Sequence, residues 1–256
     1  MHTGRKRVGL ALSGGGARGA GHVGVLEVLE REKVPIDCIA GTSAGSLVGA
    51  AYAAGIRGQR LVEVTQQTRW RQAARLTWPR DGLVSFAPLE RTVIKVMGDV
   101  TFADLEIPFA AVVTDMATGE QVVLREGRVA PAVRASCSVP GIVTPLELDG
   151  RLLADGGVVN NLPISVVRSM GAELVIAVSL FKAQGKRPSG FPSLLTSAVE
   201  YVLFRAGDDP SSADVCITLP MSGLGSVVRA SGAKRAMALG RQMAEEAMPA
   251  IRALIG

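Results

Sequence analysis

Histidine is almost absent from this chain of 256 residues, which contains only His2 and His22. Both lie near the N-terminus, so a catalytic site with a histidine late in the chain is excluded. The three cysteines, Cys38, Cys137 and Cys216, are far apart and form no CxxC motif. An odd number at this spacing is typical of reduced, mostly buried thiols rather than of a disulfide framework or a metal site. We therefore expect neither a metal nor another cofactor.

Long apolar runs are also missing. The longest, residues 47–56, has ten residues, which is about half of what a membrane-spanning helix needs. Basic residues 5–7 and apolar residues 8–12 imitate the start of a signal peptide. Five apolar residues are fewer than the roughly 7–15 of an h-region. We therefore expect a cytoplasmic protein without a signal peptide or transmembrane helix.

Acidic residues are scarce between Arg57 and Arg91, where seven arginines face three acidic side chains, and the whole chain carries a net charge of +5. No interleaved aromatic or recognition-helix pattern accompanies this charge, so we expect no nucleic-acid partner. The chain's only tryptophans, Trp70 and Trp78, also lie here. Arginine with tryptophan favours peripheral contact with an anionic membrane. Equally, the tryptophans could pack as a cap over a site while the arginines are merely solvated.

Short apolar runs alternate with helical patterns along the chain, without an internal repeat or a long linker. This alternation predicts a three-layer α/β/α sandwich with a mainly parallel central sheet. We expect one domain over residues 1–256, with a variable helical or cap segment at about 57–100. The predicted strands are 8–13, 36–40, 109–114, 120–124, 146–148, 151–154, 174–180 and 215–219, and the predicted helices are 18–31, 44–54, 58–76, 129–136 and 227–254.

The first glycine-rich motif is Gly14-Gly-Gly-Ala-Arg-Gly19, which matches GxGxxG between a predicted strand and helix. A dinucleotide site would need a ribose-binding carboxylate at the C-terminal end of the next strand. Asp37 instead precedes the core of that strand. We therefore expect no dinucleotide, and an anion-binding loop of backbone N–H groups instead.

The second motif is Gly41-Thr-Ser43-Ala-Gly45, again between a strand and a helix. This pattern is typical of a nucleophile elbow, in which the serine occupies a strained turn. Gly41 and Gly45 then let the strand and the helix pack closely. An ordinary glycine-rich turn with Ser43 as a helix cap is the alternative.

The partner of Ser43 is narrowed by elimination. No histidine follows Ser43, which excludes the usual order of serine, acid and histidine. Ser46 occupies the third position after Ser43, so an SxxK arrangement is excluded too. His22 lies within a small-residue helix pattern and is interpreted as a packed helix residue. A base for Ser43 is therefore expected to be a carboxylate.

Asp155 is the best-placed carboxylate. It ends a predicted strand, and Gly156-Gly157 lets the backbone approach another loop. We expect it at the same C-terminal sheet edge as Ser43. Asp149 is explained by its hairpin turn. Asp115 also ends a strand and remains a competitor, although a hydrogen-bonded Asx turn explains it better.

In this order, Gly14–Gly19, Gly41–Gly45 and Asp155–Gly157 resemble the three signatures of the patatin-like phospholipases. Residues 135–141 and 158–163 resemble further family segments, so the likeness runs from about residue 7 to 180. The resemblance implies a serine esterase that cleaves lipid acyl esters, with Ser43 as nucleophile and Asp155 as proton acceptor. An acyl-serine would form and then be hydrolysed by water.

Such a dyad needs help from its surroundings. An ordinary aspartate is a weak base at pH 7, so we expect partial burial to raise the pKa of Asp155. Backbone N–H groups would hold the oxyanion. Arg18 could brace the loop, which we favour, or meet a lipid phosphate. The expected oxyanion residues are Gly14, Gly15, Gly16 and Ala44, and the supporting residues are Arg18, Gly19, Gly41, Gly45, Gly156 and Gly157.

Two other functions stay open. An acyltransferase or thioesterase could use the same dyad with a different acceptor or substrate. A regulatory protein could keep the fold without turnover, although the presence of both Ser43 and Asp155 argues against it.

Overall fold

The structure is a computed structural model that describes residues 4–67, 75–76, 82–180, 189–190, 194, 197–198, 201–202, 205–220 and 230–256. Trp70 and Trp78 lie outside the described residues.

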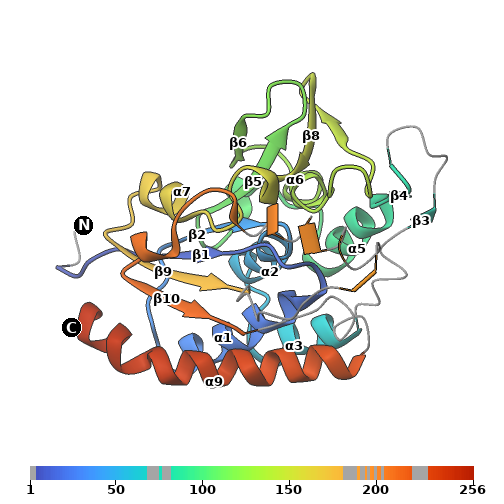
Figure 1. The fold of residues 1–256 in the computed structure, drawn as a ribbon. Coiled ribbons are helices and arrows are strands. Elements are labelled where there is room, and N and C mark those ends of the chain that lie inside the picture. The colour runs from blue at the N-terminus through green and yellow to red at the C-terminus, as the bar shows by residue number, and fades with distance from the viewer. Residues whose placement is uncertain are drawn as a thin grey trace.

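An eight-stranded sheet forms the centre of the molecule (Figure 1). Five strands run parallel in the order β10-β9-β1-β2-β5, and β8, β7 and β6 add antiparallel pairs beside β5. The strands are β1 (Val8–Leu12), β2 (Cys38–Thr42), β5 (Phe109–Asp115), β6 (Gln121–Leu124), β7 (Leu146–Leu148), β8 (Arg151–Asp155), β9 (Leu174–Ser179) and β10 (Val215–Thr218).

Helices cover both faces of this sheet because the strand side chains alternate between two apolar clusters. Leu10 and Leu12 of β1 join the cluster that contains α1 (Ala20–Arg31), α2 (Ala44–Ala53) and α9 (Ala230–Ile255). Ala11 points the other way, into the cluster that contains α7 (Ile164–Ser169). This alternation follows from the two-residue period of a strand. The predicted three-layer α/β/α fold is thus confirmed (Figure 1).

Glycines allow α1 and α9 to approach closely. A Cβ on Gly24 would overlap the backbone carbonyl of Met237, and one on Gly240 would overlap the carbonyl oxygen of Gly21. The last helix is therefore in direct backbone contact with the first long helix.

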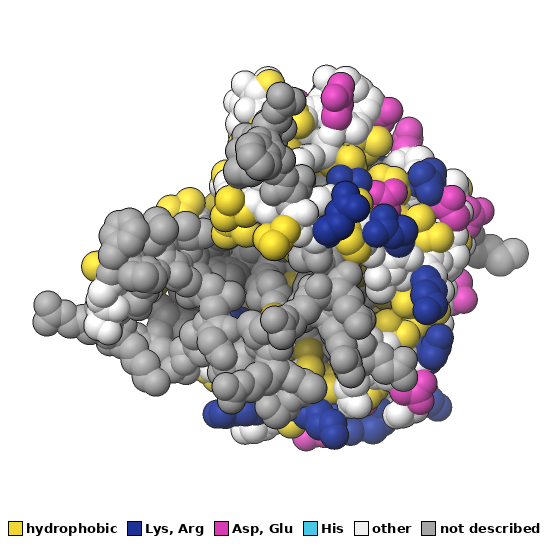
Figure 2. Space-filling view, turned by 90° about the vertical axis from the view of Figure 1, so that its right-hand side faces the viewer, with side chains coloured by type: hydrophobic (Ala, Val, Ile, Leu, Met, Phe, Trp, Pro, Cys, Tyr) yellow, Lys and Arg dark blue, Asp and Glu magenta, His cyan; other side chains and the backbone are white. Residues whose placement is uncertain are grey.

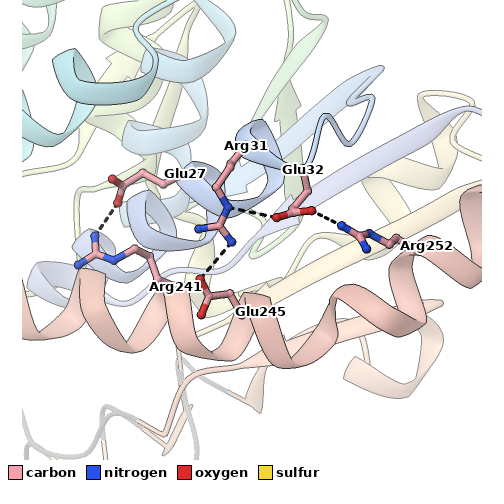
Figure 3. Close-up of polar contacts among 6 residues, drawn as sticks. All are labelled: Glu27, Arg31, Glu32, Arg241, Glu245 and Arg252. Atoms are coloured by element: carbon pink, nitrogen blue, oxygen red, sulfur yellow. Dashed lines mark hydrogen bonds and ion pairs between the residues drawn. The ribbon is translucent and has the colours of Figure 1, made fainter.

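Ion pairs also link these two helices along their exposed sides (Figure 3). All the side chains in them are at least one-fifth exposed, so each pair contributes little by itself. The pairs that cross to α9 are Glu27–Arg241 at 2.8 Å, Arg31–Glu245 at 3.0 Å and Glu32–Arg252. Arg31 also pairs with its sequence neighbour Glu32 at 3.1 Å.

The segment from 57 to 100 differs from the sequence-based expectation. The predicted helix 58–76 is α3 (Gly58–Gln67), whereas Arg75–Leu76 forms β3, antiparallel to β4 (Val84–Ser85). No helix was predicted after residue 76 in this segment, but the structure contains α5 (Ala87–Met97) there, with a proline in its first turn, where proline is tolerated.

The remaining elements are short, and α7 was also missed because it spans only six residues. They are α6 (Val129–Ser136) and the 3₁₀ turns η1 (Gly16–Gly19), η2 (Phe102–Asp104), η3 (Gly156–Val158) and η4 (Pro210–Ser212). Within the described part of the chain, no helix combines the length and the apolar character needed to cross a membrane.

Candidate active site

Ser43 occupies the sharp turn between β2 and α2. Its φ of 52° and ψ of −118° are unusual for a residue with a side chain, and such conformations cost about 1–3 kcal/mol. A Cβ on Gly41 would collide with the backbone of Gly45, and one on Gly45 would collide with the carbonyl of Leu12. The local geometry is therefore that of a nucleophile elbow, and it explains why both flanking positions are glycine.

Sheet register brings Asp155 to the level of Ser43. Thr42 of β2 pairs with Val112 of β5, and the next residue, Val113, pairs with Asp155 of β8. β8 runs antiparallel to β5, so its C-terminal residue, Asp155, comes back to the level at which β2 ends. Asp155 thus lies at the expected edge, although an antiparallel strand carries it there. The two residues meet because β5 continues past the end of β2 and pairs there with β8.

The carboxyl group of Asp155 is buried and electrostatically perturbed. Asp155 is only 2 % exposed. This burial raises the pKa of Asp155 to about 6. The Gly157 N–H donates to Asp155 Oδ1 at 2.8 Å. This bond and the Ser43 hydroxyl lower the pKa of Asp155 but do not reverse the effect of burial. At neutral pH the carboxylate can thus accept a proton.

The loop after β1 lies beside this pair, but its glycines differ in what they offer. The N–H of Gly14 donates to the carbonyl of Asn161 at 3.0 Å, so it is not available as an oxyanion donor. Among the described residues, no acceptor takes a hydrogen bond from the N–H of Gly15, Gly16 or Ala44. Gly16 has a φ of 55°, which favours glycine.

The supporting residues are packed tightly around the site. Arg18 is only 1 % exposed within η1, a burial that agrees better with bracing the loop than with meeting a lipid phosphate. A Cβ on Gly19 would come within 2.9 Å of the Ala44 Cβ, and one on Gly156 would overlap the carbonyl of Val112. Both glycines therefore let the backbone approach the region of Ser43 and Asp155.

Sequence reasoning assigned no role to Ser136, Cys137 and Ser138, although their segment carried part of the family resemblance. The Ser136 hydroxyl accepts a hydrogen bond from the Ser43 N–H at 2.8 Å. The Asp155 N–H donates to the carbonyl of Ser138, also at 2.8 Å. The Cys137 thiol is buried, and its pKa is raised by burial and by the charge of Asp155. This segment is therefore hydrogen-bonded to both residues of the pair: to Ser43 through Ser136 and to Asp155 through Ser138.

His22 and Asp115 do not join the site. His22 is fully buried on α1, and its Nε2 must donate to the Ser13 carbonyl at 2.8 Å, since a carbonyl only accepts. Burial lowers the pKa of His22 to about 4. The Asp115 carboxylate accepts from the Ala117 N–H at 2.9 Å, which confirms the Asx turn.

Asp149 and Asp37 also have structural roles. Asp149 has a φ of 51° in the tight turn between β7 and β8, as the hairpin prediction requires. Asp37 precedes β2, where it pairs with Arg5 at 2.6 Å and accepts from the Val8 N–H. It is therefore tied to the edge of the sheet opposite the elbow.

The cysteines are unpaired, with Cys38 and Cys137 buried and Cys216 partly exposed, which confirms the expected reduced thiols. In the described ranges of the chain, His, Cys, Asp and Glu side chains form no group of three that could hold a metal ion.

Comparison with known proteins identifies relatives of this chain. The family model described as patatin-like phospholipase matches residues 10–168. An uncharacterized NTE family protein of Mycobacterium tuberculosis is 40% identical over 177 residues, covering 68% of this chain and 49% of that protein. Human patatin-like phospholipase domain-containing protein 6 is 37% identical over 68% of this chain and 13% of its own length. Lysophospholipase NTE1 of Saccharomyces cerevisiae is 34% identical over 71% of this chain and 11% of its own length.

The chain thus spans at most about half the length of these relatives. Solved structures agree at the level of the fold. VipD from Legionella pneumophila has a TM-score of 0.56 at 15% identity and covers 97% of this chain and 67% of its own. ExoU from Pseudomonas aeruginosa, solved with SpcU, has a TM-score of 0.54 at 14% identity. The match covers 98% of this chain and 53% of the ExoU chain. On the family match and these identities, the chain belongs to the patatin-like phospholipase family.

Proposed function

We propose that this protein is a serine esterase that cleaves lipid acyl esters through Ser43 and Asp155. One observation carries the proposal: a serine in a strained turn lies level, in the sheet register, with a buried carboxylate whose pKa is raised to about 6. A raised pKa makes the carboxylate a stronger base near neutral pH. The 34% identity to a protein named lysophospholipase supports a lysophospholipid as the first substrate to test.

The reaction would proceed in two steps. Asp155 accepts the hydroxyl proton while Ser43 Oγ attacks the ester carbonyl, and the proton then passes to the departing alcohol. Water next attacks the acyl-serine with Asp155 again as base, which releases the fatty acid and restores Ser43. The free N–H groups of Gly15, Gly16 and Ala44 would stabilise the oxyanion in both steps. Gly14 contributes loop shape rather than an N–H, because Asn161 accepts its hydrogen bond.

The first prediction concerns covalent labelling by a fluorophosphonate probe, with fatty-acid release from a lysophospholipid measured in parallel. Wild-type protein should be labelled, and Ser43→Ala should not. Asp155→Asn keeps the acceptor oxygen for Gly157 but removes the base, so its labelling rate should fall by about 10²–10⁴-fold. Ser169→Ala, at the end of α7, serves as the control with normal labelling. Persistent labelling of Ser43→Ala would contradict the assignment.

Product analysis with added alcohol or thiol acceptors would reveal acyl transfer.

Membrane contact is a second part of the proposal, although Trp70 and Trp78 lie outside the described residues. Three exposed apolar side chains support it: Leu76 on β3, Leu83 and Ile142, which are 83 %, 56 % and 49 % exposed. The Leu83 N–H donates to the Ile142 carbonyl at 2.9 Å, so the hairpin and the loop after Ser138 form one surface.

The face that carries β3 and β4 displays apolar side chains close to lysine and arginine side chains (Figure 2). Arg75 and Arg91 are among the exposed cations of β3 and α5. Apolar groups beside cations suit an anionic lipid surface. The loop that carries Ile142 follows Ser138, whose carbonyl holds the Asp155 N–H. A lipid bound here would thus lie near the dyad.

The second prediction is that Leu83→Asp combined with Ile142→Asp weakens sedimentation with anionic phospholipid vesicles several-fold. Hydrolysis of a soluble short-chain ester should stay unchanged, because neither side chain belongs to the dyad. Ala238→Asp combined with Ala250→Asp adds the same charge to exposed positions of α9 and is the control. Equal vesicle binding by the two double variants would rule out this docking surface.

A further inference from the structure

The hydroxyl of Ser136 lies between two strands at the point where β2 leaves the sheet. Ser136 is the last residue of α6 and is completely buried. Its Oγ accepts from the Ser43 N–H at 2.8 Å and donates to the Val112 carbonyl at 2.7 Å. A hydroxyl has one proton and two lone pairs, so both bonds can form together.

The register of β2 and β5 shows what this hydroxyl replaces. The Ile39 N–H donates to the Pro108 carbonyl, and donors of a parallel ladder recur at every second residue. Continuing the pattern by two steps along both strands pairs the Ser43 N–H with the Val112 carbonyl. Ser136 Oγ is inserted between these two groups and bonds to each of them.

This insertion solves a specific problem at the elbow. The chain leaves the ladder at Ser43, which begins the turn with a φ of 52°, and its N–H bonds to Ser136 Oγ in place of the Val112 carbonyl. Both groups are buried, and buried backbone groups are rarely left unpaired. The Ser136 hydroxyl satisfies them and thereby stabilises the turned backbone.

The same segment also holds the second dyad residue. The Ser138 carbonyl accepts from the Asp155 N–H, two residues beyond Ser136. Cys137, between them, is buried, and burial first and then the charge of Asp155 raise the pKa of its thiol. The backbones of nucleophile and base are therefore anchored to one short stretch at the end of α6.

We propose that Ser136 is a positioning residue, whose hydroxyl replaces a ladder hydrogen bond and sets the orientation of Ser43 toward Asp155. This inference rests on the proposed esterase function. Ser136 itself touches neither the reacting atoms nor the substrate, and it acts through the backbone of Ser43. Losing it should therefore lower kcat while KM changes little.

The test uses a matched pair of variants, Ser136→Thr and Ser136→Val, which have the same shape and differ only in the hydroxyl. Full-length proteins are compared by circular dichroism and by kcat and KM on a soluble acyl ester across pH 5–9. Ser136→Val should have a kcat about 10²-fold below that of Ser136→Thr, since small displacements of a reacting group cost rates of this order. The acid limb of kcat/KM should also move to higher pH in Ser136→Val, because the Ser43 hydroxyl no longer stabilises the Asp155 carboxylate.

Equal kcat and an equal acid limb in the two variants would overturn the inference. The comparison holds even where both variants are less stable than wild type, since any steric strain of the larger side chain is common to both. A wild-type protein without esterase turnover would instead contradict the proposed function. Active wild type with equally active variants contradicts only the role of Ser136.

Discussion

At Ser43, backbone strain and side-chain chemistry are coupled. The turned backbone places the hydroxyl beside Asp155, and the surroundings must hold it there against its conformational cost of about 1–3 kcal/mol. Glycines at positions 41 and 45 remove the collisions that side chains would cause. Burial raises the pKa of the Asp155 carboxyl and makes it a better base, while the hydrogen bond from the Gly157 N–H stabilises its charged form.

The third prediction, at the residue scale, is the pH dependence of hydrolysis. Asp155 must be ionised to accept a proton, and burial raises its pKa to about 6. Activity should therefore rise with pH, with an acid limb in kcat/KM near 6 rather than near the ordinary value of about 4. Initial rates on a soluble ester from pH 4 to 8 measure this limb. A limb near pH 4 would show that Asp155 is not perturbed in the free enzyme.

Packing between elements decides where the helices lie. The first and last long helices touch at glycines, and β8 approaches β5 from the opposite direction to the parallel strands. Neither feature depends on the strength of any local helix or strand pattern. Each depends on how closely two backbones can approach, which is a property of the pair of elements.

The fourth prediction belongs to this element scale. Gly240→Ala should lower the free energy of unfolding by about 1–3 kcal/mol through overpacking against α1, even though alanine favours a helix by about 1 kcal/mol over glycine. Urea denaturation followed by circular dichroism gives the difference. Gly49→Ala on α2 is the control, because the new Cβ would meet only side-chain atoms at 3.1 Å or more and should cost less. A Gly240→Ala protein as stable as wild type would contradict the close contact.

Over the whole molecule, residues near both ends of the chain are joined. Beyond the family match at 10–168, β9 pairs with β1, β10 pairs with β9, and α9 covers the same face as α1. The ion pairs between α1 and α9 follow this contact (Figure 3). They are exposed, so they supplement the apolar packing instead of replacing it.

The fifth prediction concerns Glu32, which lies between Arg31 and Arg252. These partners lower the pKa of Glu32, first through the hydrogen bond from Arg31. The ionised Glu32 therefore stabilises the fold above the pKa that it has in the unfolded chain. This stabilisation is lost as the pH falls through the pKa of Glu32 in the folded protein. Glu32→Gln should slightly lower the Tm at pH 7 in low salt. The difference should vanish in 1 M salt, where the Debye length is about 3 Å.

Scanning calorimetry in low and high salt measures this effect. The control is Glu246→Gln, since Glu246 bonds to the neutral amide of Gln242 on its own helix. A Tm difference for Glu32→Gln that persists in 1 M salt would indicate lost packing and not lost charge.

The sequence by itself determined the local features of this protein. Glycine spacing and strand-turn-helix patterns identified the Ser43 elbow, the Asp149 turn and most strands, because these depend on a few neighbouring residues. The lack of a histidine after Ser43 left a carboxylate as the expected base. The strand β3 was missed because it has only two residues and is defined by its pairing with β4, and the helix α5 was missed as well.

Only the tertiary structure decided how Asp155 reaches Ser43 and which groups hold them. Strand direction and register are set between segments far apart in the chain, so β8 could not be recognised as antiparallel from its own residues. The use of the Gly14 N–H by Asn161 and the insertion of Ser136 between two strands are likewise invisible in a motif. Each of these hydrogen bonds joins residues that are far apart in the sequence, so it forms only once the fold brings the two residues together.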